Sequence, residues 1–517
     1  MAANQDVHIT LQFPLAGLDR SGSYRSSPPY GTVSAMNVRP PDVYEARRRG
    51  GSRPGVVAVS ADKTIGVPGT GSVVELNSVT YADEDAVSGD IEHVTELVAL
   101  TSSTHRYLTS AEWGQKLFIA IPDGPKVYDP LDGTGTVETY EAEIDPEVSP
   151  EDTKGEVPVD CPLIARYRDR IFMAGDPGYM WYASRTANPY DWDYGQTDPG
   201  RAVSGLNSEA GTVGDPITAM FAHGDSYLAF GCVNAIWVMR GDPAYGGRID
   251  NVSRTVGILG PHAWTHGPGG MLYFLSHNGL MSLPPGLGGV PQPVSQFRLP
   301  QEMKGVDPNE YRIALAYDAL AHGLHLFCTH DTEASKDIRY WYDFGHESFW
   351  PFDTIERVIS RGYQNTADRG RQAVLGCTTS TGLGPIISFE SGVLEGESDN
   401  PRMSSHVVYG PVMLGGSEYV DGMVVELIGT LAQDSGNVRW KLYVGETPER
   451  AASLASANST PFASGTWSAG TTGLNYTERP RARGGAFALR LESMTNSSWA
   501  MESVHAKVRN LGAKRKL

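Results

Sequence analysis

Histidines, carboxylates and arginines are the residues of this chain whose types and spacing could support chemistry. Imidazole is a common zinc ligand, and His322, His325 and His330 fall within nine residues. Positions 322 and 325 face opposite sides of a strand, however, so the spacing favours polar residues at turns and strand edges. The sequence also lacks the HExxH, GxxxxGK[ST] and GxSxG patterns of zinc peptidases, phosphate-binding loops and hydrolases. We therefore expect no enzyme, no cofactor and no metal site.

Two carboxylates lie in an aromatic segment, GYMWYASRTANPYDWDYG. Asp191 and Asp193 are two positions apart, whereas a glycosidase needs two carboxylates about 5–10 Å apart on either side of a sugar, which a single local pair does not provide. The surrounding rings could stack on a sugar, but tyrosine and tryptophan are also enriched at subunit contacts. We favour an aromatic interface loop formed by Trp181, Tyr182, Tyr190 and Trp192.

An acidic loop precedes this segment. Pro146, Pro150 and Pro158 disfavour regular structure there, so an exposed loop is expected, with a channel gate as the less favoured alternative. Its candidate residues are Glu138, Glu141, Glu143, Asp145, Glu147, Glu151 and Asp152.

Four arginines fall within seven residues near the N-terminus, flanked by glycine and proline residues that predict a tight turn. Their guanidinium groups require carboxylate or phosphate partners. Two interpretations remain open: a docking turn that meets an acidic face of a neighbouring subunit, or a turn paired within its own chain. The residues are Arg47, Arg48, Arg49 and Arg53.

The elements that must position these residues are mostly strands. Six segments repeat a turn, an apolar strand, a second turn and an aromatic-rich strand at intervals of 45 to 56 residues, close to the length of a propeller blade. The segments open near Gln115, Asp169, Asp225, Gly270, Gly323 and Arg371. Packing six such units around an axis would bury their apolar faces. A pair of β-sandwiches could give similar hairpins and is the alternative.

Longer alternating strands follow residue 403, as in VRWKLYVG and AFALRLES, and predict a β-sandwich resembling a jelly roll. Helices are expected only near residues 95 and 450. The predicted fold class is therefore all-β, with about six propeller blades, an N-terminal β segment and a C-terminal sandwich. The expected domains are 1–95 (N-terminal docking segment), 96–400 (propeller) and 401–517 (sandwich).

Composition limits the partners. The formal net charge of −18, from 60 acidic and 42 basic residues, disfavours tight binding of nucleic acid, although acidic walls would let DNA slide past. The sequence contains no secretion signal and no apolar stretch long enough to span a bilayer, so synthesis in a cytoplasm is expected. Four widely spaced cysteines are expected to be buried free thiols: Cys161, Cys232, Cys328 and Cys377.

Three stretches together resemble one known family. NVRPPDVYEARRRGGSRPG (residues 37–55) is similar to a pattern near the start of many phage tail and tail-stabilisation proteins. ITAMFAHGDSYLAFGCVNAIWVMRGDP (217–243) resembles the family's hairpin with a Trp strand and Arg-Gly-Asp-Pro. PFASGTWSAG followed by RPRARGGAFALRLES resembles its closing strands. The family is that of the tail nozzle proteins of short-tailed bacteriophages, also called tail tubular protein B.

The resemblance implies a structural virion protein in the tail. It implies a ring of about six copies below the portal and adaptor, through which double-stranded DNA is retained and ejected. Implied partners are further copies of the chain, the head-to-tail adaptor, tail fibre or spike proteins, and passing DNA that is not bound by sequence. The alternative is a propeller-type carbohydrate-binding protein or glycosidase that acts on host surface polysaccharide.

Overall fold

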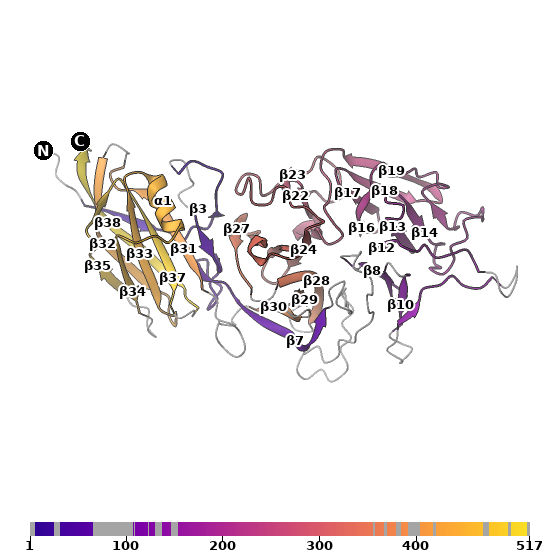
Figure 1. Ribbon diagram of the computed structural model, residues 1–517, viewed down its shortest axis with the longest axis horizontal. Helices are drawn as coiled ribbons and strands as arrows, with labels where there is room; N and C mark the ends of the chain where they lie inside the picture. Colours follow the sequence, from indigo (N-terminus) through magenta and orange to yellow (C-terminus); the bar gives the residue numbers. More distant parts are fainter. Residues whose placement is uncertain are drawn as a thin grey trace.

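Six small, mostly antiparallel sheets and a two-sheet sandwich make up most of this all-β chain, seen in a computed structural model (Figure 1). The structure describes residues 6–24, 31–65, 107, 109–121, 124–129, 137–145, 153–354, 357–366, 370–378, 384–390, 404–416, 420–468, 475–494 and 498–513. The boundaries expected at residues 95 and 400, and the helix expected near residue 95, lie outside these ranges, so both boundaries stay predictions. No helix in the described ranges is long and apolar enough to cross a membrane.

The six sheets follow one another along the chain. Sheet 1 contains β8 (Thr109–Trp113), β9 (Lys116–Ala120), β10 (Lys126–Tyr128) and β11 (Val137–Thr139). Sheet 2 contains β12 (Leu163–Tyr167), β13 (Arg170–Ala174), β14 (Trp181–Ala183) and β15 (Val203–Ser204). Sheet 3 contains β16 (Ile217–His223), β17 (Tyr227–Cys232), β18 (Ile236–Asp242) and β19 (Tyr245–Ser253).

The second half of the series has the same order. Sheet 4 contains β20 (Trp264–His266), β21 (Leu272–Ser276), β22 (Gly279–Leu283) and β23 (Gln292–Pro293). Sheet 5 contains β24 (Tyr311–Asp318), β25 (Gly323–His330), β26 (Ile338–Asp343) and β27 (Ser348–Pro351), extended by β2 (Gly17–Leu18) and β3 (Gly31–Thr32). Sheet 6 contains β28 (Arg357–Thr366), β29 (Gly370–Thr378) and β30 (Gly384–Glu390), and its fourth strand is β7 (Gly55–Ile65). Two short 3₁₀ turns interrupt the series: Pro268–Gly270 precedes β21, and Ala334–Lys336 precedes β26.

The first strands of the six sheets surround a common axis. Strand β12 contacts both β8 and β16, and β24 contacts both β20 and β28. A cavity of about 500 Å³ is walled by residues from all six first strands. The sheets are thus the blades of a six-bladed propeller, and β7, from early in the chain, pairs with β30 to complete the last blade. The predicted fold class is confirmed.

The repeats expected from the sequence correspond to the second and third strands of each blade. The turn before the second strand uses left-handed backbone in several blades, with φ of 58° and 68° at Gly114 and Gln115 and of 47° and 55° at Arg168 and Asp169. Such turns match the twist of paired strands, which is why polar and glycine residues punctuate the repeat.

The C-terminal sandwich has two antiparallel sheets of five strands. One contains β1 (Asp6–Leu11), β38 (Met501–Ala513), β32 (Val420–Leu431), β35 (Asn475–Glu478) and β36 (Ala482–Gly484). The other contains β34 (Ala463–Trp467), β33 (Val438–Gly445), β37 (Ala486–Ser493), β31 (His406–Met413) and β4 (Ala35–Met36). Strand β33 shows the alternating burial that its sequence predicts.

Helix α1 (Pro448–Ser456) covers the outer face of β31, β33 and β37, where a helix was expected. Thr447 caps it by accepting a hydrogen bond from the Arg450 amide, and Pro448 occupies its first turn. Its alanines Ala451, Ala452 and Ala455 are buried against the sheet.

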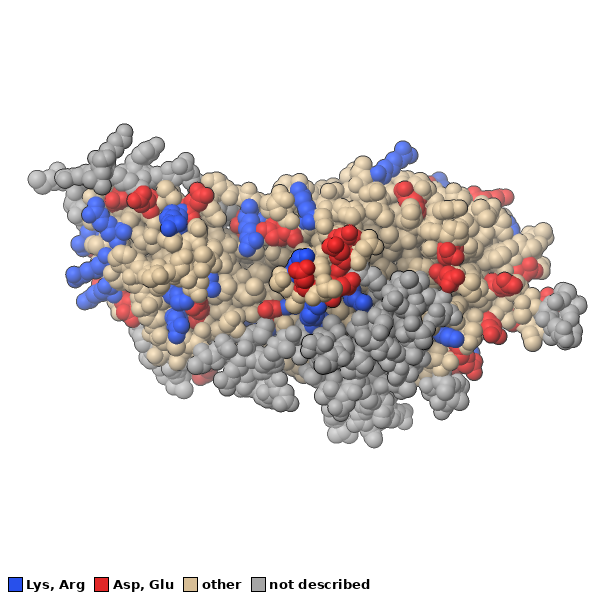
Figure 2. Space-filling view, viewed as in Figure 1, with Lys and Arg blue, Asp and Glu red and all other residues tan. Residues whose placement is uncertain are grey.

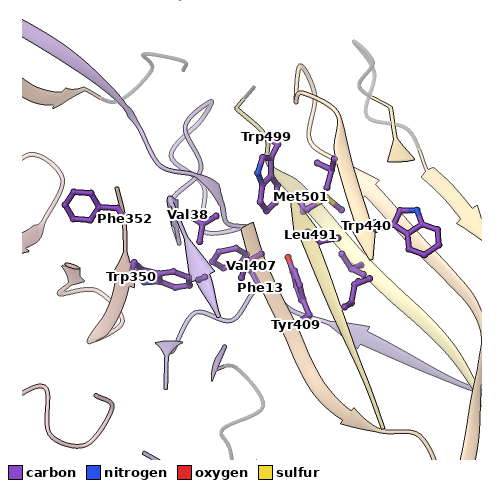
Figure 3. Close-up of a cluster of buried hydrophobic side chains, with 14 of the residues drawn as sticks. Phe13, Val38, Trp350, Phe352, Val407, Tyr409, Trp440, Leu491, Trp499 and Met501 are labelled. Carbon is purple, nitrogen blue, oxygen red and sulfur yellow. The ribbon is translucent and has the colours of Figure 1, made fainter. Parts of the chain in front are cut away.

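One hydrophobic core runs from the propeller into the sandwich. Figure 3 shows Phe352 and Trp350 on the propeller side, Phe13 and Val38 in the middle, and Trp440 deep in the sandwich. Phe13 stacks on Trp350 at 5.3 Å between ring centroids. The N-terminal segment fills this seam: β1 pairs with β38, β4 with β31, and β2 with β27, while β5 (Val38–Arg39) pairs with β6 (Gly51–Ser52). Strands β1, β2 and β4 therefore extend sheets on both sides of the seam, whereas β5 and β6 form a two-stranded sheet of their own. All four cysteines are buried free thiols, as expected.

Candidate functional site

The seam between propeller and sandwich is built from the arginine-rich N-terminal stretch. Asn37 Nδ2 donates to the Ser404 carbonyl of the sandwich at 2.9 Å. Asn37 Oδ1 accepts from Arg53 Nε at 3.1 Å and from the Asp353 amide, beyond β27, at 2.7 Å. Arg53 Nη2 donates to the Asp353 carbonyl at 3.1 Å. One asparagine and one arginine thus join strands from both modules; we call this group the interdomain joint.

A second arginine is buried in the joint. Arg39 is 4% exposed, and its guanidinium lies 3.9 Å from the centroid of the Trp341 ring and near the Phe389 ring. Its Nε and Nη2 atoms have no hydrogen-bond partner among the described residues. Burial, reinforced by Arg53, lowers the pKa of Arg39 to about 9. The two aromatic faces flank this cation, and ring quadrupoles attract cations more strongly where water is excluded. The charges of Asp318 and Asp343 oppose the lowering of its pKa.

His325 lies beside this cation and remains neutral at pH 7. Its Nε2 atom is 3.9 Å from Asp318 Oδ2, and its ring stacks on Phe389. Burial lowers its pKa to about 4, although Asp318 opposes that shift. His330 accepts amide hydrogen bonds from the following turn, and His322 has left-handed backbone in the turn before β25. No cluster of three metal-ligating side chains occurs in the described part of the chain.

Close backbone approach explains the paired glycines of the stretch. A Cβ atom on Gly51 would lie 2.2 Å from the Trp499 carbonyl oxygen, and one on Gly50, whose φ is +75°, would enter the Phe13 ring. Next to them, Ser52 Oγ accepts from the Trp499 amide at 3.0 Å. Any larger side chain would separate the N-terminal turn from β38.

The arginine turn is paired mainly within its own chain. Arg49, whose side chain is 8% exposed, contacts Asp42 at 3.1 Å and Glu502 of β38 at 2.7 Å. Arg47 reaches Glu502 at 2.9 Å. The docking hypothesis is wrong for Arg53, because its side chain is buried at 1% exposure. Arg49 forms its ion pairs with Asp42 and Glu502 of its own chain. Arg48 is exposed and forms no ion pair with any residue that the structure describes.

The aromatic segment is largely core. Trp181 and Trp192 are 0% exposed, so the interface hypothesis is wrong for both: Trp181 packs between blades 2 and 3, and Trp192 packs between blades 1 and 2. Tyr182 and Tyr190 are half-buried. Tyr190 contacts the Phe118 ring of β9 at 5.9 Å. Two aromatic rings thus remain partly accessible.

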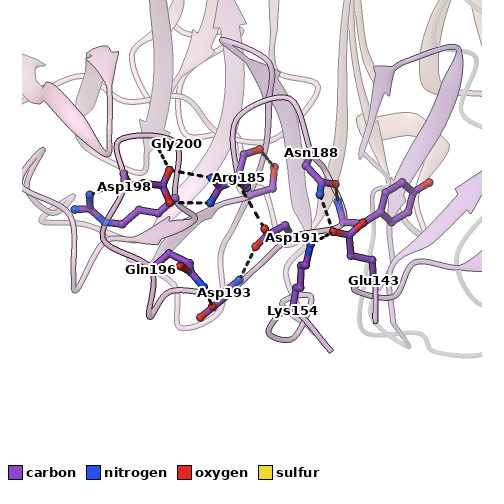
Figure 4. Close-up of polar contacts among 12 residues, drawn as sticks. Glu143, Lys154, Arg185, Asn188, Asp191, Asp193, Gln196, Asp198 and Gly200 are labelled. Carbon is purple, nitrogen blue, oxygen red and sulfur yellow. Dashed lines mark hydrogen bonds and ion pairs between the residues drawn. The ribbon is translucent and has the colours of Figure 1, made fainter. Parts of the chain in front are cut away.

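The described part of the acidic loop is fastened to the aromatic segment, as Figure 4 shows. Glu143 accepts from Lys154 Nζ at 2.6 Å and from Asn188 Nδ2 at 3.0 Å. The Lys154 pair lowers the pKa of Glu143. Arg185 donates two hydrogen bonds of 2.9 Å to the carboxylate of Asp198. Its Nε atom lies 3.9 Å from Asp191 Oδ2. Glu138 and Glu141 are exposed and Asp145 is half-buried, whereas Glu147, Glu151 and Asp152 lie outside the described residues.

Asp191 and Asp193 serve local structure. Asp191 accepts from the Asp193 amide, and Asp193 accepts from Gly195 and Gln196. Burial raises the pKa of Asp191. The axial cavity holds a different set of groups, including Arg166, Arg361, His262 and His266, and Glu112 is the one carboxylate in its described lining. A carboxylate pair across a sugar is therefore not assembled by those lining residues.

Blades 2 and 3 are linked by a pair that the sequence did not single out. Arg170, 0% exposed, donates through Nε and Nη2 to the two carboxylate oxygens of Asp242, both at 3.0 Å. Arg170 also donates to the carbonyls of Ser184 and Arg201. Asp242 belongs to the Arg-Gly-Asp-Pro sequence, the only signal that could have pointed to this pair.

Fold and site define an all-β protein in which a six-bladed propeller is joined to a β-sandwich by a buried polar seam. No family model and no curated protein matches the chain. Among solved structures it is similar to the extracellular domain of a putative hybrid two component system from B. thetaiotaomicron, with a TM-score of 0.38 and 13% identity over 74% of this chain and 44% of that one. For a second such domain from the same organism, the TM-score is 0.40 and the sequence identity is 10%, over 88% of this chain and 57% of that one. The chain spans less than two thirds of either protein.

Proposed function

We propose that this chain is a structural subunit of the tail of a short-tailed bacteriophage, where about six copies form a nozzle ring below the portal and adaptor. The genome is retained above this ring and leaves through it. The subunit acts by shape and rigidity and carries out no chemical step. The adaptor and the tail fibres or spikes are its neighbours.

The proposal rests on one observation: residues of the stretches that resemble the tail nozzle family lie at the contacts between modules and between blades. Asn37, Arg39 and Arg53 of the first stretch form the interdomain joint. Asp242 of the second stretch links blades 2 and 3 through Arg170. A subunit that guides DNA under pressure needs its modules fixed relative to one another, and buried hydrogen-bonded groups such as Asn37 and Arg53 favour one geometry. The matching residues are thus ones that such a role would require.

The carbohydrate-directed alternative has less support. A glycosidase site on the propeller axis needs two carboxylates on opposite sides of the sugar. Glu112 is the one carboxylate in the described lining of the axial cavity, and Asp191 and Asp193 are used in turns away from it. Sugar release from host capsule or lipopolysaccharide by the purified chain would nevertheless replace our proposal with that alternative.

Antibody labelling of intact particles tests the proposal. Polyclonal antibody raised against the purified chain should decorate virus particles at the tail in negatively stained electron micrographs. Preabsorption with the purified chain is the control and should abolish the labelling. Particles that the antibody leaves bare, with the chain detected only in the culture fluid, would contradict the proposal.

A further inference from the structure

The two ends of the molecule differ in charge. Residues 107–216, which include blades 1 and 2, contain 20 Asp and Glu against eight Lys and Arg. Residues 401–517, which include most of the sandwich, contain 13 Lys and Arg against nine Asp and Glu. Blades 1 and 2 and the sandwich lie at opposite ends of the elongated chain in Figure 1. Figure 2 shows blue side chains gathered at the sandwich end and mainly red ones at the far end. The chain therefore has an electrically polar long axis.

The propeller end presents apolar and acidic side chains together. Ile144 and Val159 are 58% and 59% exposed, a cost in free energy that contact with a partner would remove. The described residues 137–145 and 153–160 also carry four exposed carboxylates that form no ion pair with the residues the structure describes. These four and the two aliphatic residues are here called the propeller tip: Glu138, Glu141, Ile144, Glu156, Val159 and Asp160.

The sandwich end presents the complementary chemistry. Arg479, Arg481 and Arg483 lie between or within β35 and β36; we call them the arginine loop. Arg479 and Arg483 are 70% and 68% exposed at their side chains, each with one contact to a carboxylate, at 3.3 Å to Glu426 and 3.5 Å to Asp421. Arg481 is exposed and has a left-handed φ of 50°. Most of the guanidinium donors of the loop face solvent.

We infer that the arginine loop of one copy docks on the propeller tip of a second copy. Guanidinium groups meet carboxylates in a planar, bidentate geometry, and Ile144 and Val159, once covered by the second copy, would add a contact that excludes water. Because the two surfaces differ and lie at opposite ends, the contact is head-to-tail, and such contacts generate closed rings or open chains. The inference deepens the proposed function, on which its biological role rests, by assigning the surfaces through which copies associate.

Mass photometry of the full chain tests the inference. The wild-type chain should associate beyond dimers at low salt and dissociate in 0.5 M salt, with an apparent dissociation constant raised about tenfold or more by screening. R479Q/R481Q/R483Q and E138Q/E141Q/E156Q should each be monomeric at the same concentration. Mixed one to one, they retain one intact loop and one intact tip between them, so the mixture should form dimers and nothing larger. The control variant R248Q/R254Q/K304Q removes three positive charges at other exposed positions, as the arginine-loop variant does, and should associate as the wild type does.

A monomeric wild-type chain at low salt, or a mixture of the two variants that stays monomeric or exceeds a dimer, would overturn the inference. Thermal melting of each variant, followed by circular dichroism, shows whether it is folded, and a triple variant that unfolds is replaced by its single substitutions. Particles that contain the chain in a fixed copy number, combined with a monomeric purified chain, would reject the docking contact and leave the tail function standing.

Discussion

Arg53 and Asn37 are joined twice: the Arg53 amide donates to the Asn37 carbonyl at 2.9 Å, and Arg53 Nε donates to Asn37 Oδ1 at 3.1 Å. Asn37 has a left-handed backbone with φ of 55°, a conformation that asparagine adopts more readily than most residues. The Asn-x-Arg-Pro and Arg-Pro-Gly sequences thus meet in space at the interdomain joint.

Removal of the Arg53 side chain should weaken the joint. Arg53→Leu removes the buried donor to the Pro54 and Asp353 carbonyls and one of the two donors to Asn37 Oδ1. Each unpaired carbonyl costs about 1–3 kcal/mol, so unfolding should require roughly 3 kcal/mol less. Urea unfolding followed by tryptophan fluorescence measures the change. Arg48→Leu, at an exposed position in the same turn, is the control and should stay within about 0.5 kcal/mol of wild type. Equal effects of the two changes would count against the joint.

The link between blades 2 and 3 should be sensitive to one carboxylate. Asp242→Ala leaves the guanidinium of Arg170 buried without its counter-charge, and loss of one partner of a buried pair costs about 3–5 kcal/mol. Asp250→Ala, in the neighbouring strand β19, removes an exposed carboxylate paired with Arg248 at 3.0 Å and should cost about 1 kcal/mol or less. Thermal melting of both variants decides the matter, and a smaller loss for Asp242→Ala than for Asp250→Ala would contradict the assignment.

Gly51 should accept no side chain. Gly51→Ala places a Cβ atom against the Trp499 carbonyl, so backbone must move and the melting temperature should fall by several degrees, in line with about 1–3 kcal/mol of overpacking. Gly22→Ala is the matched control because nothing lies within 4 Å of its added Cβ. Differential scanning calorimetry compares the two. An unchanged melting temperature for Gly51→Ala would show that the turn and β38 do not approach so closely.

Stability should fall as the pH drops from 7 to 5. Burial lowers the pKa of His406 to about 3 and that of His325 to about 4, below the ordinary histidine pKa of 6.5. In this window the unfolded chain binds protons that the folded chain does not, so each histidine removes about 2 kcal/mol of stability on acidification. His406→Gln, which can keep a hydrogen bond to Ser34 Oγ, should reduce that loss by about 2 kcal/mol. Urea unfolding at pH 7 and pH 5 measures it, and an identical pH dependence in the variant would refute the assignment to His406.

Much of the fold is encoded in local patterns. The six hairpins, the strands of the sandwich and helix α1 follow from turn residues and alternation that are local in sequence. The pairing of β7 with β30 and of β1 with β38 joins residues hundreds of positions apart, and no local pattern specifies such partners. Trp181 and Trp192 were expected at an interface because composition does not distinguish a ring buried between blades of its own chain from one buried by a neighbouring subunit. The partners of the arginine turn were likewise hidden, since Glu502 is distant in sequence.

The central claim is that this chain is a structural part of a phage tail, and counting it in purified virus particles tests that claim most directly. Quantitative mass spectrometry with isotope-labelled peptides would compare its copy number with that of the portal subunit. We expect about one copy for every two portal subunits, the ratio of a six-fold ring below a twelve-fold portal. Absence from the particles, or trace amounts only, would contradict the tail assignment and would favour a secreted protein directed at host polysaccharide.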